Sequence, residues 1–275
     1  MFVISCANQK GGVGKTTTAV SLATEFAMKG FKTLLIDSDA QANATGNFVS
    51  PGSFTHSLYD VVVEEGDMQS LPIKDVVIPT GIDNLDLVPS RLKLSTFDMQ
   101  PPDMINILKA KLTEVSDYYE FVVIDNPPSL SQLLMASLIA STHVLIPVAA
   151  EPMAHDGIDD FLRTFHRVAS RSNKNLALLG MVTTKFDGRL AVHGNVHQQL
   201  LERYPEYVFD TIIHQNSKLV ESPAFHQPIQ TYSPQSRGSQ NYNSLAEEIL
   251  VRLGNPKPKS INDLNQSQDQ VGAKG

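Results

Sequence analysis

The chain has 275 residues, 41% of them hydrophobic and 19% charged, which is typical of a globular protein with a complete apolar core. The formal net charge is −7, which excludes a protein that is basic over its whole surface, as a nucleic-acid coat protein would be. The single cysteine, Cys6, cannot form an internal disulfide and indicates a reducing compartment.

The N-terminal part of the chain predicts a strand, a glycine-rich loop and a helix in succession. Residues 2–7 form a short apolar run, and residues 16–29 carry apolar side chains on one side of a helix that Gly30 would end. Residues 33–36 predict a second buried strand. Residues 44–118 are less regular, and we expect them to form a small subregion that elaborates one edge of the sheet.

The remainder of the chain alternates strands with helices. The predicted strands are 121–124, 144–148, 176–183 and 208–213. The predicted helices are 132–140, 156–172, 190–203 and 242–253. Continuously apolar strands between helices predict an α/β fold, with a mostly parallel twisted sheet and helices on both faces. We expect one domain over residues 1–254 and a polar, disordered tail over residues 255–275.

The first loop has the pattern of a phosphate-binding loop. It follows a predicted strand and opens a predicted helix, which is the context that this motif requires. Its backbone N–H groups and the start of the helix would face phosphate oxygens, with Lys15 on the β- and γ-phosphates and the Thr16 hydroxyl on Mg²⁺. Gln9 replaces the first glycine of the common motif, and a second lysine, Lys10, follows it. The predicted ATP-binding residues in the loop are Lys10, Gly11, Gly12, Val13, Gly14, Lys15, Thr16 and Thr17.

Aspartates follow two of the predicted strands, at the edge of the sheet where ligands bind in parallel folds. Asp125 suits a role in holding Mg²⁺. Asp37 and Asp39 alternate and would share one face of an extended segment, one directed to the metal and the other to a water nucleophile. An aspartate after a strand can also be a simple turn residue. Two such sites beside a phosphate loop favour the functional interpretation.

These segments together resemble the ParA/Soj branch of the deviant Walker A ATPases, a group that also contains MinD. The resemblance rests on KGGVGKTT at 10–17, LLIDSDAQAN at 34–43 and VVIDNPPS at 122–129. Three later segments are also similar to the family, TTKFDGR at 183–189, KLVESP at 218–223 and SRGSQNY at 236–242. The match covers roughly residues 2–253 at spaced intervals.

The resemblance implies a deviant Walker A P-loop fold and a slow, Mg²⁺-dependent ATPase. In the family, two subunits sandwich two ATP molecules, and the signature lysine, here Lys10, reaches the partner's phosphates. Asp39 would position the attacking water, and Thr16 and Asp125 would serve Mg²⁺, so that Lys10, Lys15 and Asp39 form the catalytic set. Pro223 would lie near adenine.

The resemblance also implies partners and a role. It implies an ATP-dependent homodimer that binds DNA non-specifically, and a ParB-like adaptor that stimulates hydrolysis, so that plasmid or chromosomal DNA is segregated. The chain would be a cytoplasmic, nucleoid-associated protein of the short form, without an N-terminal helix-turn-helix domain. No apolar run reaches the roughly 18 residues of a membrane-spanning helix, and no signal peptide is evident.

Other functions remain open at this level. A ParA-like ATPase can position a different cargo, such as a chemotaxis array or a protein compartment. A MinD-like membrane switch would need a C-terminal amphipathic helix, which the tail does not offer, so we expect no stable membrane anchor. A ligase that shares the loop would need a second substrate pocket, which the sequence does not identify.

The charge is unevenly distributed along the chain. Residues 1–150 hold 9 basic and 16 acidic residues, whereas residues 151–254 hold 10 and 11. Three arginines spaced by four share one face of the predicted helix 156–172, and basic residues from later segments join them if the fold brings these segments together. The candidate DNA-binding residues are Arg163, Arg167, Arg171, Lys185, Arg189, Lys218 and Arg237. Such a patch suits contacts with phosphates, although charge runs are also common on ordinary solvated helix faces.

Overall fold

The computed structural model describes residues 1–50, 52–64, 69–152 and 154–257, so most of the predicted tail lies outside the described residues. Within these ranges the strands form one sheet with the order β3-β4-β2-β5-β1-β6-β7-β8. The strands are β1 (Phe2–Cys6), β2 (Thr33–Asp37), β3 (Ile78–Pro79), β4 (Leu85–Val88), β5 (Phe121–Asp125), β6 (His143–Ala149), β7 (Ala177–Phe186) and β8 (Val208–His214).

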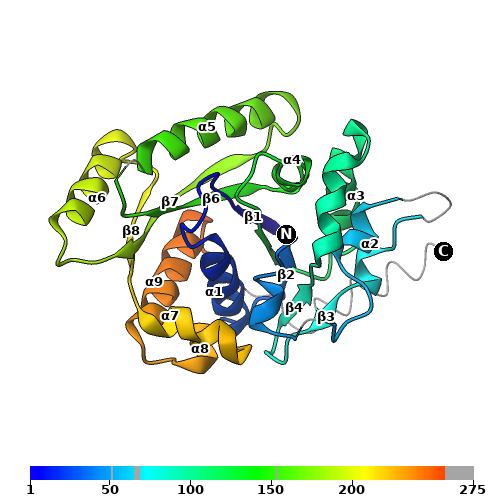
Figure 1. Cartoon of the computed structure of the whole chain (residues 1–275), viewed down its shortest axis with the longest axis horizontal. Coiled ribbons are helices and arrows are strands. Elements are labelled where there is room, and N and C mark those ends of the chain that lie inside the picture. The colour runs from blue at the N-terminus through cyan, green and yellow to red at the C-terminus, as the bar shows by residue number, and fades with distance from the viewer. Residues whose placement is uncertain (51, 65–68, 153, 258–275) are drawn as a thin grey trace.

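Helices lie on both faces of this sheet (Figure 1). They are α1 (Lys15–Met28), α2 (Leu58–Val62), α3 (Ile107–Thr113), α4 (Gln132–Ala140), α5 (Ala154–Arg171), α6 (Ala191–Arg203), α7 (Ser217–Glu221), α8 (Ile229–Tyr232) and α9 (Arg237–Arg252). Short 3₁₀ segments are η1 (Thr45–Asn47), η2 (Ile73–Asp75), η3 (Leu92–Met99), η4 (Pro102–Asn106) and η5 (Ser222–Phe225). The predicted α/β architecture is therefore confirmed.

Neighbouring strands run parallel, except that the short edge strand β3 pairs antiparallel with β4. The central strands are buried on both faces, which explains their continuously apolar sequences. In β5, Phe121 and Val123 pack into the layer that contains α1 and α9, whereas Val122 and Ile124 pack on the opposite side. This alternation follows the two-residue period of a strand.

The α1–α9 layer contains a stack of aromatic side chains. The Phe26 and Phe121 rings stack with their centroids 4.3 Å apart, and Phe31 meets Phe121 edge-on at 5.0 Å. Aromatic pairs at such distances contribute about 0.5–1.5 kcal/mol beyond the apolar area that they bury. The stack fixes α1 against β5, and α1 is the helix that the phosphate loop opens.

One boundary differs from the predicted elements in an informative way. Helix α9 begins at Arg237 rather than at 242, because the Ser236 hydroxyl accepts a hydrogen bond from the Ser239 N–H and caps a polar first turn that lacks apolar periodicity. Residues 44–118 do elaborate a sheet edge, as expected, since β3 and β4 extend the sheet beyond β2.

The register brings the predicted site together at one edge of the sheet. Cys6, the last residue of β1, lies opposite Asp125, and Asp37 lies opposite Asp125 on the other side of β5. The loop that follows β1 therefore starts beside both aspartates. The parallel topology thus places three predicted segments at one location.

Candidate active site

The loop between β1 and α1 has the backbone conformation of a phosphate-binding loop. Gly12 and Gly14 adopt left-handed φ values of 74° and 86°, which residues with a Cβ atom rarely adopt. Gly14 is the N-cap of α1, so the free N–H groups of the first helical turn point into the loop. Anions bind readily at this arrangement of amides and helix dipole.

Lys15 is held inside the loop. Its side chain is largely buried, and Nζ donates a hydrogen bond of 3.3 Å to the backbone carbonyl of Lys10. Burial lowers the pKa of Lys15, while the charges of Asp125 and Asp39 raise it. The ammonium group therefore gains from a nearby anion, as the predicted contact with phosphates requires.

Asp125 has the properties of a ligand for a divalent cation. The residue is fully buried, and neither carboxylate oxygen has a hydrogen-bond partner among the described residues. Burial raises the pKa of Asp125, the charge of Asp37 raises it further, and the adjacent Thr16 hydroxyl acts in the opposite direction. A carboxylate with free oxygens beside a hydroxyl fits Mg²⁺, which usually takes one or two protein ligands and completes its shell with phosphate oxygens and water.

Asp37 has a different environment, although it is also fully buried. Its Oδ2 accepts hydrogen bonds of 2.7 Å from both the N–H and the hydroxyl of Thr45, and its Oδ1 accepts one of 3.1 Å from the Asp39 N–H. These bonds fasten the segment after β2 to the end of that strand. Asp37 thus has a clear structural role, and its predicted role as a metal ligand stays a prediction.

Asp39 is partly exposed at the same edge of the sheet. Its Oδ1 accepts a hydrogen bond from the Gln41 N–H at 3.0 Å. This contact orients the carboxylate, and no hydrogen bond to Oδ2 is found within the described residues. An oriented carboxylate with a free oxygen can hold a water molecule, which is the predicted role of Asp39.

Lys10 is ion-paired within its own subunit. Its Nζ lies 3.1 Å from Oε2 of Glu151, which follows β6, and its N–H donates to the Asn8 side chain. Asn8 in turn donates to the carbonyl of Pro147. The start of the loop is thereby fixed to the end of β6, while the Lys10 side chain stays about one-third exposed.

Four side chains at this edge of the sheet were not predicted from the sequence to belong to the nucleotide site. They are Asn8, Asn126, Glu151 and Lys185. Each follows or ends an apolar strand, so the rule that ligands bind at the carboxyl edge of parallel sheets could have marked them. Asn126, for example, donates to the carbonyls of Cys6 and Ile124 and has a buried Oδ1 atom without a donor among the described residues.

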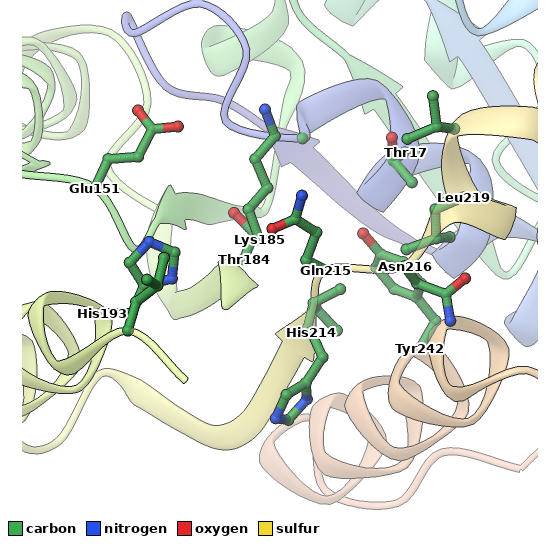
Figure 2. Close-up of a pocket in the computed structure, with 14 residues that line it drawn as sticks. Thr17, Glu151, Thr184, Lys185, His193, His214, Gln215, Asn216, Leu219 and Tyr242 are labelled. Atoms are coloured by element: carbon green, nitrogen blue, oxygen red, sulfur yellow. The ribbon is translucent and has the colours of Figure 1, made fainter. Parts of the chain in front are cut away.

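Two cavities adjoin the first turn of α1. One has a volume of about 430 Å³ and lies between the phosphate loop, the ends of β7 and β8, and Tyr242 of α9 (Figure 2). The other, of about 250 Å³, lies between Thr16, Thr17, Asn47 and Pro223. Pro223 is therefore brought close to the phosphate loop, as its predicted place near adenine requires.

The seven candidate DNA-binding residues do not form one patch. Arg163, Arg167 and Arg171 belong to α5, which packs on the face of the sheet opposite to α9 (Figure 1). Arg189 and Arg237 line a separate cavity of about 480 Å³, and Lys218 lies next to it in sequence after the lining residue Ser217. The fold therefore does not bring the α5 arginines together with Lys218 and Arg237, because the sheet separates them.

Comparison with known proteins identifies the family. A family model described as an AAA domain (AAA_31) matches residues 1–178. The chromosome-partitioning ATPase Soj of Treponema pallidum is 37% identical over 250 residues, which cover 90% of this chain and 96% of that protein. The chromosome partitioning protein ParA of Caulobacter vibrioides is 33% identical and covers 91% of this chain and 94% of its own length. The chain belongs to the ParA/Soj family.

A solved structure agrees with the ParA/Soj fold. Cobyrinic acid a,c-diamide synthase from Mycobacterium smegmatis, with a bound ATP analogue and magnesium, has a TM-score of 0.79 and 27% identity, and the match covers 94% of this chain and 99% of that one. This ParA/Soj family member thus has the P-loop ATPase fold that the sequence predicts. In the part of the chain that the structure describes, no helix is both long and apolar enough to cross a membrane.

Proposed function

We propose that the protein is a ParA-type ATPase that segregates or positions plasmid or chromosomal DNA. ATP and Mg²⁺ bind at the phosphate loop, two subunits form an ATP-dependent sandwich dimer, and the dimer binds DNA non-specifically on the nucleoid. A ParB-like adaptor stimulates hydrolysis. The observation that carries the proposal is a phosphate loop with two lysines, Lys10 and Lys15, in a ParA/Soj family member.

The lysines, Thr16 and the aspartates of the site each have a place in this function. Lys15 and the amides of the loop bind the phosphate chain, and Thr16 and Asp125 hold Mg²⁺, which neutralises phosphate charge when bound. Asp39 orients the water that attacks the terminal phosphate. Asp37 holds the segment that carries Asp39 through its hydrogen bonds with Thr45.

The dimer depends on Lys10. The negative charge of a triphosphate enclosed between two subunits needs cations from both subunits. If Lys10 contacts the nucleotide bound by the partner, association of the subunits depends on ATP. The Lys10 side chain is partly exposed, and among the residues that the structure describes its single ionic partner is Glu151, in an ion pair that solvent can reach. Such an exposed pair is weak, typically about 0–1 kcal/mol, and can open when a triphosphate is offered.

The Lys10→Ala variant tests the dimer. In sedimentation velocity with a non-hydrolysable ATP analogue and Mg²⁺, we expect wild-type protein to sediment as a dimer and the variant as a monomer, although the variant still binds the analogue. Lys74→Ala, at an exposed position of η2, is the matched control and should dimerise normally. A dimer of the Lys10→Ala variant with wild-type affinity would refute the role of Lys10 across the interface.

The cargo is tested separately. If the ATP-bound protein binds DNA non-specifically, it is retained on DNA of unrelated sequences. Its ATP turnover then rises when DNA and the partner protein are both present. A ParA-like ATPase for another cargo, such as a protein compartment or a chemotaxis array, would instead respond to a partner from that assembly. The synthase neighbour has only 27% identity, and we favour partition because the partition relatives have higher identity over nearly their full length.

A further inference from the structure

Lys185 occupies an unexpected place for a candidate DNA-binding residue. It lies near the end of β7 and lines the 430 Å³ cavity together with Gly14 and Thr17. Figure 2 shows its side chain extending toward the phosphate loop. A Cβ atom placed on Gly12 would lie 4.0 Å from the Lys185 Nζ, so the ammonium group is next to the turn of the loop.

The end of β7 is fastened to the loop in a fixed position. The Thr184 hydroxyl donates a hydrogen bond of 2.8 Å to the carbonyl of Val13, and the Thr184 carbonyl accepts one of 3.0 Å from the Ala150 N–H. Thr184 is buried, and a Cβ atom on Gly14 would lie 3.9 Å from its side chain. The position of Lys185 relative to the loop is therefore set by its neighbour.

The backbone of Lys185 also points to a role for its side chain. Its φ is +53°, in the left-handed region that residues with a Cβ atom seldom occupy. Glycine or asparagine would adopt this conformation at lower cost. Strained residues of this kind concentrate at functional sites, where the side chain has a use.

Three of the polar side chains that line the cavity with Lys185 are already engaged with other groups of the protein. Glu151 is paired with Lys10, Tyr242 shares a hydrogen bond with Thr18, and the Asn216 side chain caps α7. Within the described ranges of the chain Lys185 itself has no ion pair. The residue is exposed, so its ammonium group is solvated in the unliganded protein and is free to bind a phosphate placed at the loop.

We propose that Lys185 is a third phosphate-binding lysine of the site, which contacts the phosphate chain of the nucleotide bound by its own subunit. The proposal rests on the function proposed above. Lys15 approaches the phosphates from within the loop, whereas Lys185 reaches the loop from β7. Lys10 contacts the nucleotide of the partner subunit. Lys185 therefore supplies a further cation to the nucleotide of its own subunit before the dimer forms.

The proposal is tested by measuring the nucleotide affinity of three Lys185 variants. Lys185→Met removes the charge at similar length, Lys185→Arg keeps it, and Lys185→Gly removes it while relieving the backbone strain. By titration with a fluorescent ATP analogue in Mg²⁺, we expect Lys185→Met and Lys185→Gly to bind roughly 10- to 100-fold more weakly, which is the range for a lost charge-assisted hydrogen bond. Lys185→Arg should retain most of the affinity, and Lys74→Met is the surface control. Affinity for adenosine, which has no phosphate, should be the same in all variants.

The outcomes separate this proposal from its alternatives. Wild-type affinity for the ATP analogue in Lys185→Met would overturn the proposal. An equal loss of adenosine affinity would also overturn it, because the substitution would then alter the shape of the cavity and not a contact with phosphate. A variant with normal nucleotide affinity that loses retention on DNA at saturating nucleotide would show that Lys185 contacts DNA instead. If the wild-type protein itself did not bind ATP, the proposed function would fail, and Lys185 would not be the cause.

Discussion

At the scale of single residues, the buried carboxylates at the ends of β2 and β5 act against folding when no cation is bound. Burial raises the pKa of both Asp125 and Asp37 above the usual value for aspartate, and each negative charge opposes the other across the Asp37–Asp125 pair in the sheet register. A raised folded-state pKa means that folding favours the protonated acid. The associated stability is complete below the unfolded-state pKa, near 3.9, and is lost as the pH rises through the folded-state value.

Asp125→Asn should therefore stabilise the nucleotide-free protein at neutral and alkaline pH. We expect the free energy of unfolding to rise by about 1–2 kcal/mol at pH 8 and by less at pH 5, because the asparagine removes the charge that folding disfavours. Urea denaturation in the presence of a chelator measures this. Asp83→Asn, at an exposed position, serves as the control and should have no effect. A variant that is less stable than wild type at both pH values would contradict this account of Asp125.

At the scale of elements, an irregularity in β7 positions the strand end that carries Lys185. The register between β6 and β7 shifts between Val144 and Leu145, opposite Leu178 and Gly180. The last residue of α9, Arg252, donates to the carbonyls of Leu179, Tyr207 and Val208, and its guanidinium lies 3.8 Å from the centroid of the Phe209 ring. The bulge is thus fixed by a helix on the α1–α9 face.

Gly180→Ala should disrupt this arrangement. A Cβ atom at position 180 would lie 2.5 Å from the carbonyl oxygen of Tyr207 and 2.7 Å from the Arg252 guanidinium. We expect a loss of about 2–4 kcal/mol in the free energy of unfolding, measured by denaturant titration. Gly194→Ala is the matched control, because it lies within α6 in open space, and should stabilise the protein by about 0.5–1 kcal/mol. Equal effects of the two substitutions would show that the bulge does not constrain β7.

At the scale of the whole molecule, a protein with net charge −7 that binds DNA must gather its cations on one surface. For the proposed DNA binding, the cavity with Arg189 and Arg237 is the better candidate, because its wall from His214 to Asn216 also lines the 430 Å³ cavity beside the phosphate loop. If the proposed function holds, that shared wall would connect the nucleotide site to the DNA-binding surface. The α5 arginines have no such connection. Ion pairing does not separate the two groups, because Arg163 is paired with Asp160 and Arg189 with Asp187.

The two groups of arginines can be compared directly in DNA retention. We expect Arg189→Glu combined with Arg237→Glu to abolish ATP-dependent retention on DNA, and Arg167→Glu combined with Arg171→Glu to reduce it only modestly. Wild-type affinity should fall steeply with salt, with a slope of about −0.9 in log–log form for each phosphate contacted. Gel-shift titrations at several salt concentrations measure both effects. A larger loss from the α5 pair would assign the DNA surface to α5.

The sequence predicts local features of this molecule well and distant contacts poorly. Apolar runs reveal the buried central strands. The phosphate loop and the two aspartate-bearing strand ends can each be recognised because the residues of each segment are contiguous, and the rule for parallel sheets predicts that the segments meet. The pairing of Lys10 with Glu151 joins residues 141 positions apart. The approach of Lys185 to the loop, and the separation of the arginines by the sheet, likewise depend on how helices and strands are stacked, which no local pattern encodes.

The buried thiol at the end of β1 allows local opening of the site to be measured by chemical modification. Cys6 is the single cysteine of the chain, is fully buried beside Asp125, and has a pKa that burial raises further. An alkylating reagent can reach it only when the end of β1 opens, so the modification rate reports the free energy of local opening beneath the phosphate loop. Anything that binds the closed loop must slow this reaction in proportion to its occupancy. Ligands can therefore be ranked by mass spectrometry on unmodified wild-type protein, without a label or a substitution.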